Sequence, residues 1–100
     1  MIKHIVTWKL KETNSLKKVE QANMIKQTLE ALKPKIKEII YLEIGLDCNS
    51  YDESNWDITL ISEFESFNTL KAYIKHPDHQ EVVAKIKPYF SGRVCVDYEI

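Results

Sequence analysis

The segment 73–79, which reads Tyr-Ile-Lys-His-Pro-Asp-His, holds two of the chain's three histidines together with a tyrosine. A neutral imidazole can act as a general base, and a tyrosine hydroxyl can polarise a carbonyl. Proline disfavours the α region for the residue before it, so a helix is expected to end at His76. Asp78 is then placed to cap a second helix, with Glu81 completing a capping box. The spacing therefore predicts a site at a helix break, where the tyrosine and the second histidine converge on one pocket wall.

The candidate general base of this segment is His79, and Tyr73 is the candidate hydrogen-bond donor. We expect His79 at the positive end of a helix dipole, which disfavours the imidazolium form. Tyr73 shares a helical stripe with apolar residues, so its ring is expected to face the core and its hydroxyl to need a partner. Each residue also has a structural interpretation, as a packing or capping histidine and as a core aromatic. His76 is expected to be structural or exposed.

The elements that must position these residues follow from apolar periodicity. Residues 2–11 alternate with a period of two, which predicts a strand. An apolar stripe recurs every three or four residues over 16–32 and predicts a helix. This helix is expected to be capped by Asn14 or Ser15 and to end at Pro34.

The rest of the chain completes a recognisable order of elements. Strands are predicted over residues 36–46 and 56–64, joined by a polar loop at 47–55. Ser66 is expected to cap a short helix before the His-Pro break. Gly92 is expected to let the chain turn into a last strand over 94–100, after a helix marked by Val82, Val83, Ile86 and Phe90. The resulting β-α-β-β-α(α)-β order is the ferredoxin-like α+β plan, a four-stranded antiparallel sheet with helices on one face.

Some strand residues are apolar on the face opposite the predicted core, namely Ile5, Ile39, Tyr41 and Ile61. A sheet with helices on one side only would leave them exposed to water. The sheet of a second copy is the simplest cover, so we expect a homodimer packed sheet to sheet.

Composition narrows the class of protein. The chain has 100 residues and a net charge of −1, and we expect a single soluble domain over 1–100. This charge gives no broad basic field for nucleic acid or anionic lipid. No apolar run approaches the roughly 18 residues of a membrane helix. We therefore expect neither a nucleic-acid nor a membrane partner and, without a signal-peptide pattern, a cytoplasmic location.

The cysteines Cys48 and Cys95 lack the spacing of a metal-binding motif. A structural zinc site needs about four ligands, and no such set is visible, so we expect no metal and no other cofactor. A disulfide has no support from the expected compartment. We expect two ordinary thiols, buried or half-buried.

The chain resembles the stress-responsive A/B-barrel domain family, also called the Dabb or dimeric α/β-barrel family, over nearly all of its length. Four segments carry the resemblance: Ile-Lys-His-Ile-Val at 2–6, Phe-Glu-Ser at 64–66, the segment 73–79, and Val-Cys-Val-Asp-Tyr-Glu at 94–99. The resemblance implies a ferredoxin-like protomer and a homodimer whose two sheets close into a barrel. Many members are stress-induced or uncharacterised proteins, and one plant branch contains a polyketide cyclase that performs an aldol condensation with carboxylate retention.

In that cyclase branch a histidine and a tyrosine of the same motif act as a pair. The resemblance places them at His79 and Tyr73, and places a strand-one histidine at His4. If no gap intervenes, a pocket histidine on the third strand of that branch falls at Ile58 here, and a first-helix tyrosine falls at Lys26. Both differences remove polar contacts to a phenolic or polyketide substrate.

The leading hypothesis is a homodimer with a pocket, between sheet and helices, for an apolar or aromatic carbonyl-bearing small molecule. We expect this pocket to be lined by His4, Trp8, Ile58, Tyr73 and His79. As a polyketide-cyclase-like lyase, the protein would use His79 to abstract a proton α to a carbonyl and Tyr73 to stabilise the enolate. As a non-catalytic structural protein, it would use the same segment to shape a helix junction. An open cavity at these side chains favours the first two hypotheses, and a filled core favours the third.

Overall fold

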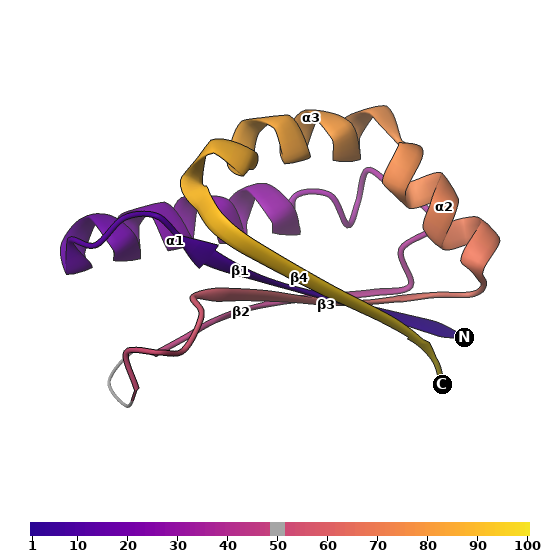
Figure 1. The fold of residues 1–100 in the computed structure, drawn as a ribbon. Coiled ribbons are helices and arrows are strands. Elements are labelled where there is room, and N and C mark those ends of the chain that lie inside the picture. Colours follow the sequence, from indigo (N-terminus) through magenta and orange to yellow (C-terminus); the bar gives the residue numbers. More distant parts are fainter. Residues whose placement is uncertain (49–51) are drawn as a thin grey trace.

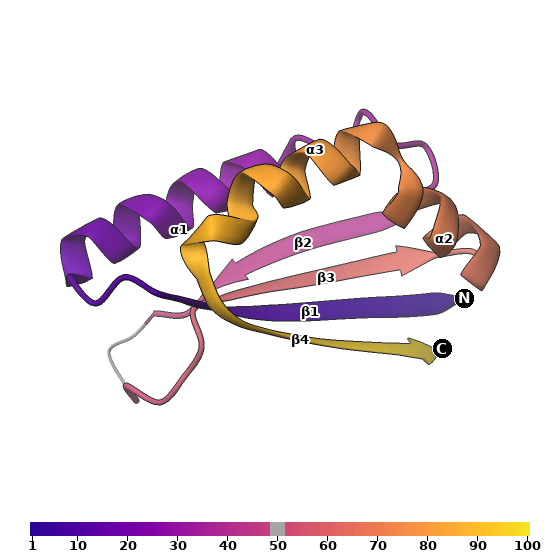
Figure 2. The same cartoon turned by 45° about the horizontal axis from the view of Figure 1, so that its top comes forward.

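The computed structural model describes residues 1–48 and 52–100. The order of elements is β1 (Ile2–Leu10), α1 (Ser15–Glu30), β2 (Tyr41–Leu46), β3 (Ile58–Phe64), α2 (Phe67–Lys75), α3 (Pro77–Ile86), the 3-10 helix η1 (Lys87–Tyr89) and β4 (Phe90–Glu99). The strands form one antiparallel sheet in the order β2-β3-β1-β4. Figures 1 and 2 show the helices on one face of this sheet. The predicted ferredoxin-like α+β plan is confirmed.

The core lies between the central strands and the helices. Every second residue of β1 is buried, from Ile2 to Leu10, and β3 buries every second residue from Ile58 to Phe64. Burial of each large apolar side chain favours folding by about 1.5–3 kcal/mol, and this holds the helices on that face. The predicted alternation of the first strand is therefore confirmed, and it places His4 and Trp8 on the helix side of the sheet.

A buried carboxylate joins three elements where β1 ends. Asp57 is 3% exposed, and its Oδ2 accepts a hydrogen bond of 2.8 Å from the backbone N–H of Leu10. Its Oδ1 lies 3.1 Å from Nζ of Lys18 on α1. The backbone N–H of Asp57 also donates to the carbonyl of Trp8 at 2.9 Å. These contacts fix the end of β1 against the start of β3 and against α1.

The caps of the first two helices are those that the sequence predicts. Asn14 accepts a hydrogen bond of 3.0 Å from the backbone N–H of Lys17 at the start of α1. Ser66 caps α2 and exchanges hydrogen bonds with Thr69 in a capping box. The end of α1 differs from the prediction, because the helix stops at Glu30, before Pro34.

The helix break lies at the predicted place, but its capping residue is different. His76 has extended backbone dihedrals, with φ −60° and ψ 134°, and it both ends α2 and begins α3. Its Nδ1 accepts a hydrogen bond of 3.1 Å from the backbone N–H of Asp78. The prediction that Asp78 caps α3 with Glu81 is therefore wrong. The reason is that Pro77 already occupies the first helical position, where its missing N–H costs nothing. The structural role predicted for His76 is confirmed.

Two strand boundaries also differ from the prediction. β2 begins at Tyr41, and the preceding Ile36 and Ile39 are buried in the core from a turn segment rather than from a strand. Ile39 was expected on the face of the sheet opposite the core, and this expectation is wrong. The predicted loop at 47–55 falls partly outside the described residues.

The last strand begins earlier than predicted. Phe90 belongs to β4 and not to the preceding helix, and Gly92 lies inside the strand instead of at a turn. A Cβ atom on Gly92 would come within 3.0 Å of the Trp56 ring, so the glycine makes room for this indole. Its role is close approach and not chain reversal.

β4 is an edge strand whose apolar side chains from Val94 onward face away from the helices. Val94, Val96 and Tyr98 are 53%, 60% and 41% exposed. Ile5 and Ile61 lie half-buried on the same open face, and no described element covers it (Figure 1). The polar residues Arg93, Cys95 and Asp97 alternate with the apolar ones, and they pair with residues of β1 that face the helices.

Two further expectations concern the thiols and the membrane. Cys48 and Cys95 are both exposed, so the expectation that they are buried or half-buried is wrong. Within the described ranges, no helix combines the length and the apolar character that crossing a bilayer requires.

Candidate active site

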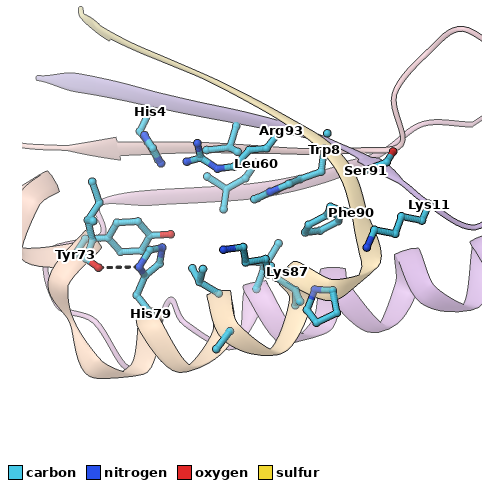
Figure 3. Close-up of a pocket in the computed structure, with 18 residues that line it drawn as sticks. His4, Trp8, Lys11, Leu60, Tyr73, His79, Lys87, Phe90, Ser91 and Arg93 are labelled. Carbon is cyan, nitrogen blue, oxygen red and sulfur yellow. Dashed lines mark hydrogen bonds between the residues drawn. The ribbon is translucent and has the colours of Figure 1, made fainter.

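A cavity of about 840 Å³ lies between the helix-facing side of the sheet and the segment from α2 to η1. Small-molecule sites typically have volumes of roughly 300–1,000 Å³, so it is large enough for a drug-sized ligand. Figure 3 shows its two walls, with β1, β3 and β4 on one side and the helices on the other. Most lining side chains are apolar, among them Val6, Leu29, Leu60, Val83, Ile86 and Phe90.

Four of the five side chains predicted to line a pocket do line this cavity: His4, Trp8, Tyr73 and His79. His4, Tyr73 and His79 gather at one end of the cavity (Figure 3). Trp8 lies toward the other end, where it stacks on Phe90 with ring centroids 5.3 Å apart. Ile58 does not line it. Ile58 lies on β3 between its partners Trp8 and Leu46, and it is 1% exposed, so its side chain is enclosed in the core.

The helix break brings Tyr73 and His79 together. Tyr73 lies near the end of α2 and His79 in the first turn of α3, and their ring centroids are 4.3 Å apart with an interplanar angle of 48°. The Tyr73 ring also contacts Phe64 at 4.9 Å and lies edge-on to His4 at 6.2 Å. The Tyr73 ring therefore contacts both His4 and His79. Within the described part of the chain, no hydrogen bond connects these three side chains.

The hydrogen bond of His79 determines which nitrogen carries the proton. Its Nδ1 lies 3.0 Å from the backbone carbonyl of Ile74. A carbonyl only accepts, so Nδ1 donates and Nε2 of the neutral ring has a free lone pair. Burial lowers the pKa of His79, and electrostatic interactions with His4, Arg93 and His76 lower it further, against the opposing effect of the Ile74 carbonyl. His79 is therefore neutral near pH 7, as a general base requires.

The hydroxyl of Tyr73 is available to a ligand. Tyr73 is 1% exposed, and within residues 1–48 and 52–100 its hydroxyl makes no hydrogen bond. Burial raises its pKa to about 12, although the nearby charge of Arg93 lowers it. The group stays protonated at neutral pH and can donate a hydrogen bond to an oxygen in the cavity.

His4 has a carboxylate partner that was not predicted from the sequence. Its Nδ1 donates a hydrogen bond to Oδ1 of Asp97, the residue directly opposite on β4. Sγ of Cys95 lies 3.6 Å from the same nitrogen. The carboxylate fixes the ring orientation and holds a proton on Nδ1, so that Nε2 is the nitrogen left for other contacts.

The same three residues are the candidates for holding a metal ion. The ligand atoms of His4, Cys95 and Asp97 all lie within 4.8 Å of one another. The hydrogen bond between His4 and Asp97 satisfies this pair without an ion, so we assign Asp97 to the orientation of the imidazole.

Arg93 is the second residue that the sequence argument missed. It lines the cavity from β4, and its charge lowers the pKa values of both Tyr73 and His79. The signal for both missed residues lies in the last strand, where Arg93 and Asp97 alternate with Val94 and Val96. Because successive side chains of a strand point to opposite faces, the polar residues face the helices when Val94 and Val96 face away from them.

A model of the Stress responsive A/B Barrel Domain family matches residues 2–100. This chain belongs to the Dabb family. The resemblance found in the sequence is therefore confirmed. A comparison of this Dabb domain with curated proteins gave no match.

Solved structures show the same fold. A dimeric protein of unknown function from Bacteroides fragilis NCTC 9343 is 36% identical to the Dabb domain, with a TM-score of 0.87 over 99% of this chain and 95% of that one. A dimeric ferredoxin-like protein of unknown function from Thermobifida fusca is 27% identical, with a TM-score of 0.77 over 99% of this chain and 90% of that one. The hydroxynitrile lyase of Passiflora edulis is 22% identical, with a TM-score of 0.71 over 99% and 92% of the two chains. At this identity the likeness to the lyase shows the fold alone.

Proposed function

We propose that this Dabb domain is an enzyme that binds an apolar or aromatic carbonyl compound and removes a proton α to the carbonyl. The observation that carries the proposal is the hydrogen bond from His79 to the Ile74 carbonyl. It leaves Nε2 as a base beside the Tyr73 hydroxyl, at one end of a largely apolar cavity.

The proposed step is an enolisation. His79 Nε2 takes the proton from the α carbon, and the electron pair of the C–H bond forms the carbon–carbon double bond of an enolate. The carbonyl oxygen gains the negative charge and accepts a hydrogen bond from the Tyr73 hydroxyl. The enolate then either recovers the proton from His79, or its α carbon attacks a second carbonyl of the same ligand. In the second case the π electrons of that carbonyl move to its oxygen, which takes the proton from His79 to complete an aldol product.

Arg93 and His4 support this step from the sheet side of the cavity. The positive charge of Arg93 favours negative charge on a ligand in the cavity. His4 is held by Asp97, and its edge-on contact with Tyr73 places it beside the phenol. His4 therefore positions the donor and presents a second nitrogen to the ligand.

We also infer that the domain is a homodimer packed sheet to sheet. The open face carries exposed Val94, Val96 and Tyr98 beside the half-buried Ile5 and Ile61. Two of the relatives with this fold are described as dimeric. A contiguous apolar sheet face is the expected surface for pairing with a second copy.

One observation favours a structural role as a second candidate. The hydrogen bond from His79 on α3 to the Ile74 carbonyl on α2 also ties the two helices across the break. In that case replacement of His79 would lower the stability of the fold and leave ligand binding unchanged.

The decisive experiment uses 4-phenyl-2-butanone, an aromatic ketone with exchangeable α protons. NMR in D₂O would measure both saturable binding and deuterium incorporation next to the carbonyl. We expect the parent protein to accelerate exchange over buffer, and His79→Gln to lower this rate by about 10²-fold or more while binding persists. Tyr73→Phe should also slow exchange.

The matched control is His76→Asn, which replaces a neighbouring histidine that caps a helix by another good capping residue. It should exchange the probe at the parental rate. Equal rates in His79→Gln and the parent, or the absence of saturable binding, would show that the proposal is wrong.

A further inference from the structure

The side chains that carry a full charge along the cavity are all basic. Lys11, Lys87 and Arg93 line it, and among the described residues neither an aspartate nor a glutamate does. Across residues 1–48 and 52–100, no ion pair joins any of these three to a carboxylate. Three cations without a carboxylate partner therefore border an otherwise largely apolar space.

Two of these cations reach into the cavity from opposite walls. Arg93 extends from β4 on the sheet side and Lys87 from η1 on the helix side, and Figure 3 shows both between the histidine end and the Trp8–Phe90 end. Lys11 lies farther along, beside Phe90 (Figure 3). The middle of the cavity is thus bordered by positive charge on both sides.

A neutral ligand can fill the apolar part of the cavity, but it leaves these three charges without a partner. A ligand that fills the cavity displaces water from the charged groups, and a charge that loses water is costly unless it gains a partner. A carboxylate supplies that partner. The planar guanidinium of arginine donates two parallel hydrogen bonds to a carboxylate, and lysine adds a point charge.

We propose that the ligand of this cavity is an oxo acid, whose carboxylate is held between Arg93 and Lys87. This inference rests on the proposed function and names its substrate class. The carboxylate lies in the middle of the cavity, the carbonyl points to Tyr73 and His79, and the apolar body packs against Trp8 and Phe90. The charges thereby also fix the orientation of the ligand in the cavity.

The test compares two probes with the same aromatic body, 3-phenylpropanoate and 3-phenylpropanamide. Neither needs to react, so the result does not depend on catalysis. Calorimetric titration at low salt should show the carboxylate binding at least about 10-fold more tightly than the amide, as expected for charge-assisted hydrogen bonds. This preference should shrink as salt rises from about 0.01 M to 1 M, because the Debye length falls from roughly 30 Å to 3 Å.

The variants separate charge from geometry. Arg93→Met and Lys87→Met should each lower the preference for the carboxylate and leave binding of the amide unchanged. Arg93→Lys retains the charge and loses the planar fork, so it should retain part of the preference. The matched control is Lys85→Met, a lysine on α3 that borders a separate hollow of about 240 Å³ between α1 and α3. It should retain the full preference.

The possible results of the titration separate the oxo-acid inference from the proposed catalysis. Equal binding of the two probes, or a preference that survives both Arg93→Met and Lys87→Met, overturns the oxo-acid inference and leaves the proposed enolisation standing. Failure of both probes to bind overturns the inference and the ligand cavity together. Tight, Arg93-dependent binding of the carboxylate in a protein that exchanges no α protons supports the ligand class and removes only the proposed catalysis.

Discussion

Asp97 accepts a hydrogen bond from Nδ1 of His4, its cross-strand partner on the neighbouring β1. His4 is 4% exposed and lines the cavity, so the carboxylate orients a buried imidazole toward the ligand space. A carboxylate in this position holds one tautomer, with the proton on Nδ1 and the lone pair on Nε2. Asp97 is therefore a positioning residue that acts through His4.

Asp97→Asn tests this role. The amide can either accept from the imidazole or donate to it, so the tautomer of His4 is no longer fixed. We expect the α-proton exchange of the ketone probe to slow by about 10-fold, less than the ~10² expected for loss of the base itself. NMR of the imidazole nitrogens should show a mixed tautomer at His4. Glu99→Gln, a change on the same side of β4, is the control, and an unchanged His4 tautomer in Asp97→Asn would contradict the assignment.

The pH dependence of exchange should report His79. Its pKa lies below the ordinary value of 6.5, mainly because of burial, and the base is active when neutral. The rate should therefore rise with pH through a midpoint below 6.5 and then stay level, since the raised pKa of Tyr73, about 12, keeps its hydroxyl protonated. An NMR titration of the His79 ring gives the same midpoint directly. A midpoint above 6.5 would exclude the assignment.

The same shift predicts how stability depends on pH. Because the folded-state pKa of His79 is lower than its unfolded value, the unfolded chain binds more protons between the two. The free energy of unfolding contributed by His79 is thus fully present above about pH 6.5 and is lost as pH falls through the folded-state pKa. Denaturant unfolding of the parent and of His79→Gln, compared from pH 8 down to pH 5, measures this term. Parallel curves would show that no such linkage exists.

The open face of the sheet can be tested by adding a charge to it. Val96 is 60% exposed on β4, so Val96→Lys has little effect on the core but places an ammonium in the proposed interface. We expect sedimentation velocity to show a dimer for the parent and a monomer for the variant. Leu16→Lys is the matched control, because Leu16 is 77% exposed on α1 and faces no proposed partner. A monomeric parent, or a dimer that tolerates Val96→Lys, would refute the sheet-to-sheet arrangement.

The buried Asp57 should contribute to stability and not to chemistry. Asp57→Ala removes the acceptor for the Leu10 N–H and leaves that donor unsatisfied, which costs about 1–3 kcal/mol. Asp57→Asn retains an acceptor oxygen and should cost less. Urea unfolding at neutral pH measures both variants. If alanine and asparagine prove equally costly, the hydrogen bond to Leu10 is not the source of the effect.

Local signals predicted the elements well and the contacts between them less well. The alternation of β1 and the caps Asn14 and Ser66 depend on residues within a few positions, and they are confirmed. The predicted start of the second strand at residue 36 was too early, because Ile36 and Ile39 are buried from a turn segment before β2 and not from a strand.

The site was predictable only in part, for a different reason. The segment 73–79 places its tyrosine and histidine through a local break, which the sequence reveals. Asp97 reaches His4, and Arg93 reaches the cavity, through the pairing of β1 with β4, and this register joins residues from opposite ends of the chain. Ile58 was misplaced because a position on a strand does not indicate which part of the core surrounds it.

From Arg93 onward, β4 directs polar residues to the cavity side of the sheet and apolar residues to the open face. Residues that serve the two faces are therefore neighbours in the chain. Its register against β1 shifts once, between Lys9 and Leu10, just where the strand begins. An insertion or deletion of one residue near Ser91 would turn the strand over, moving Val94 to the cavity side of the sheet and Arg93 away from it. A single substitution in β4 thus changes one side chain, whereas a change in the length of the strand would remove both the ligand site and the proposed dimer face. Variants of this domain should accordingly differ in the composition of the last strand much more readily than in its length.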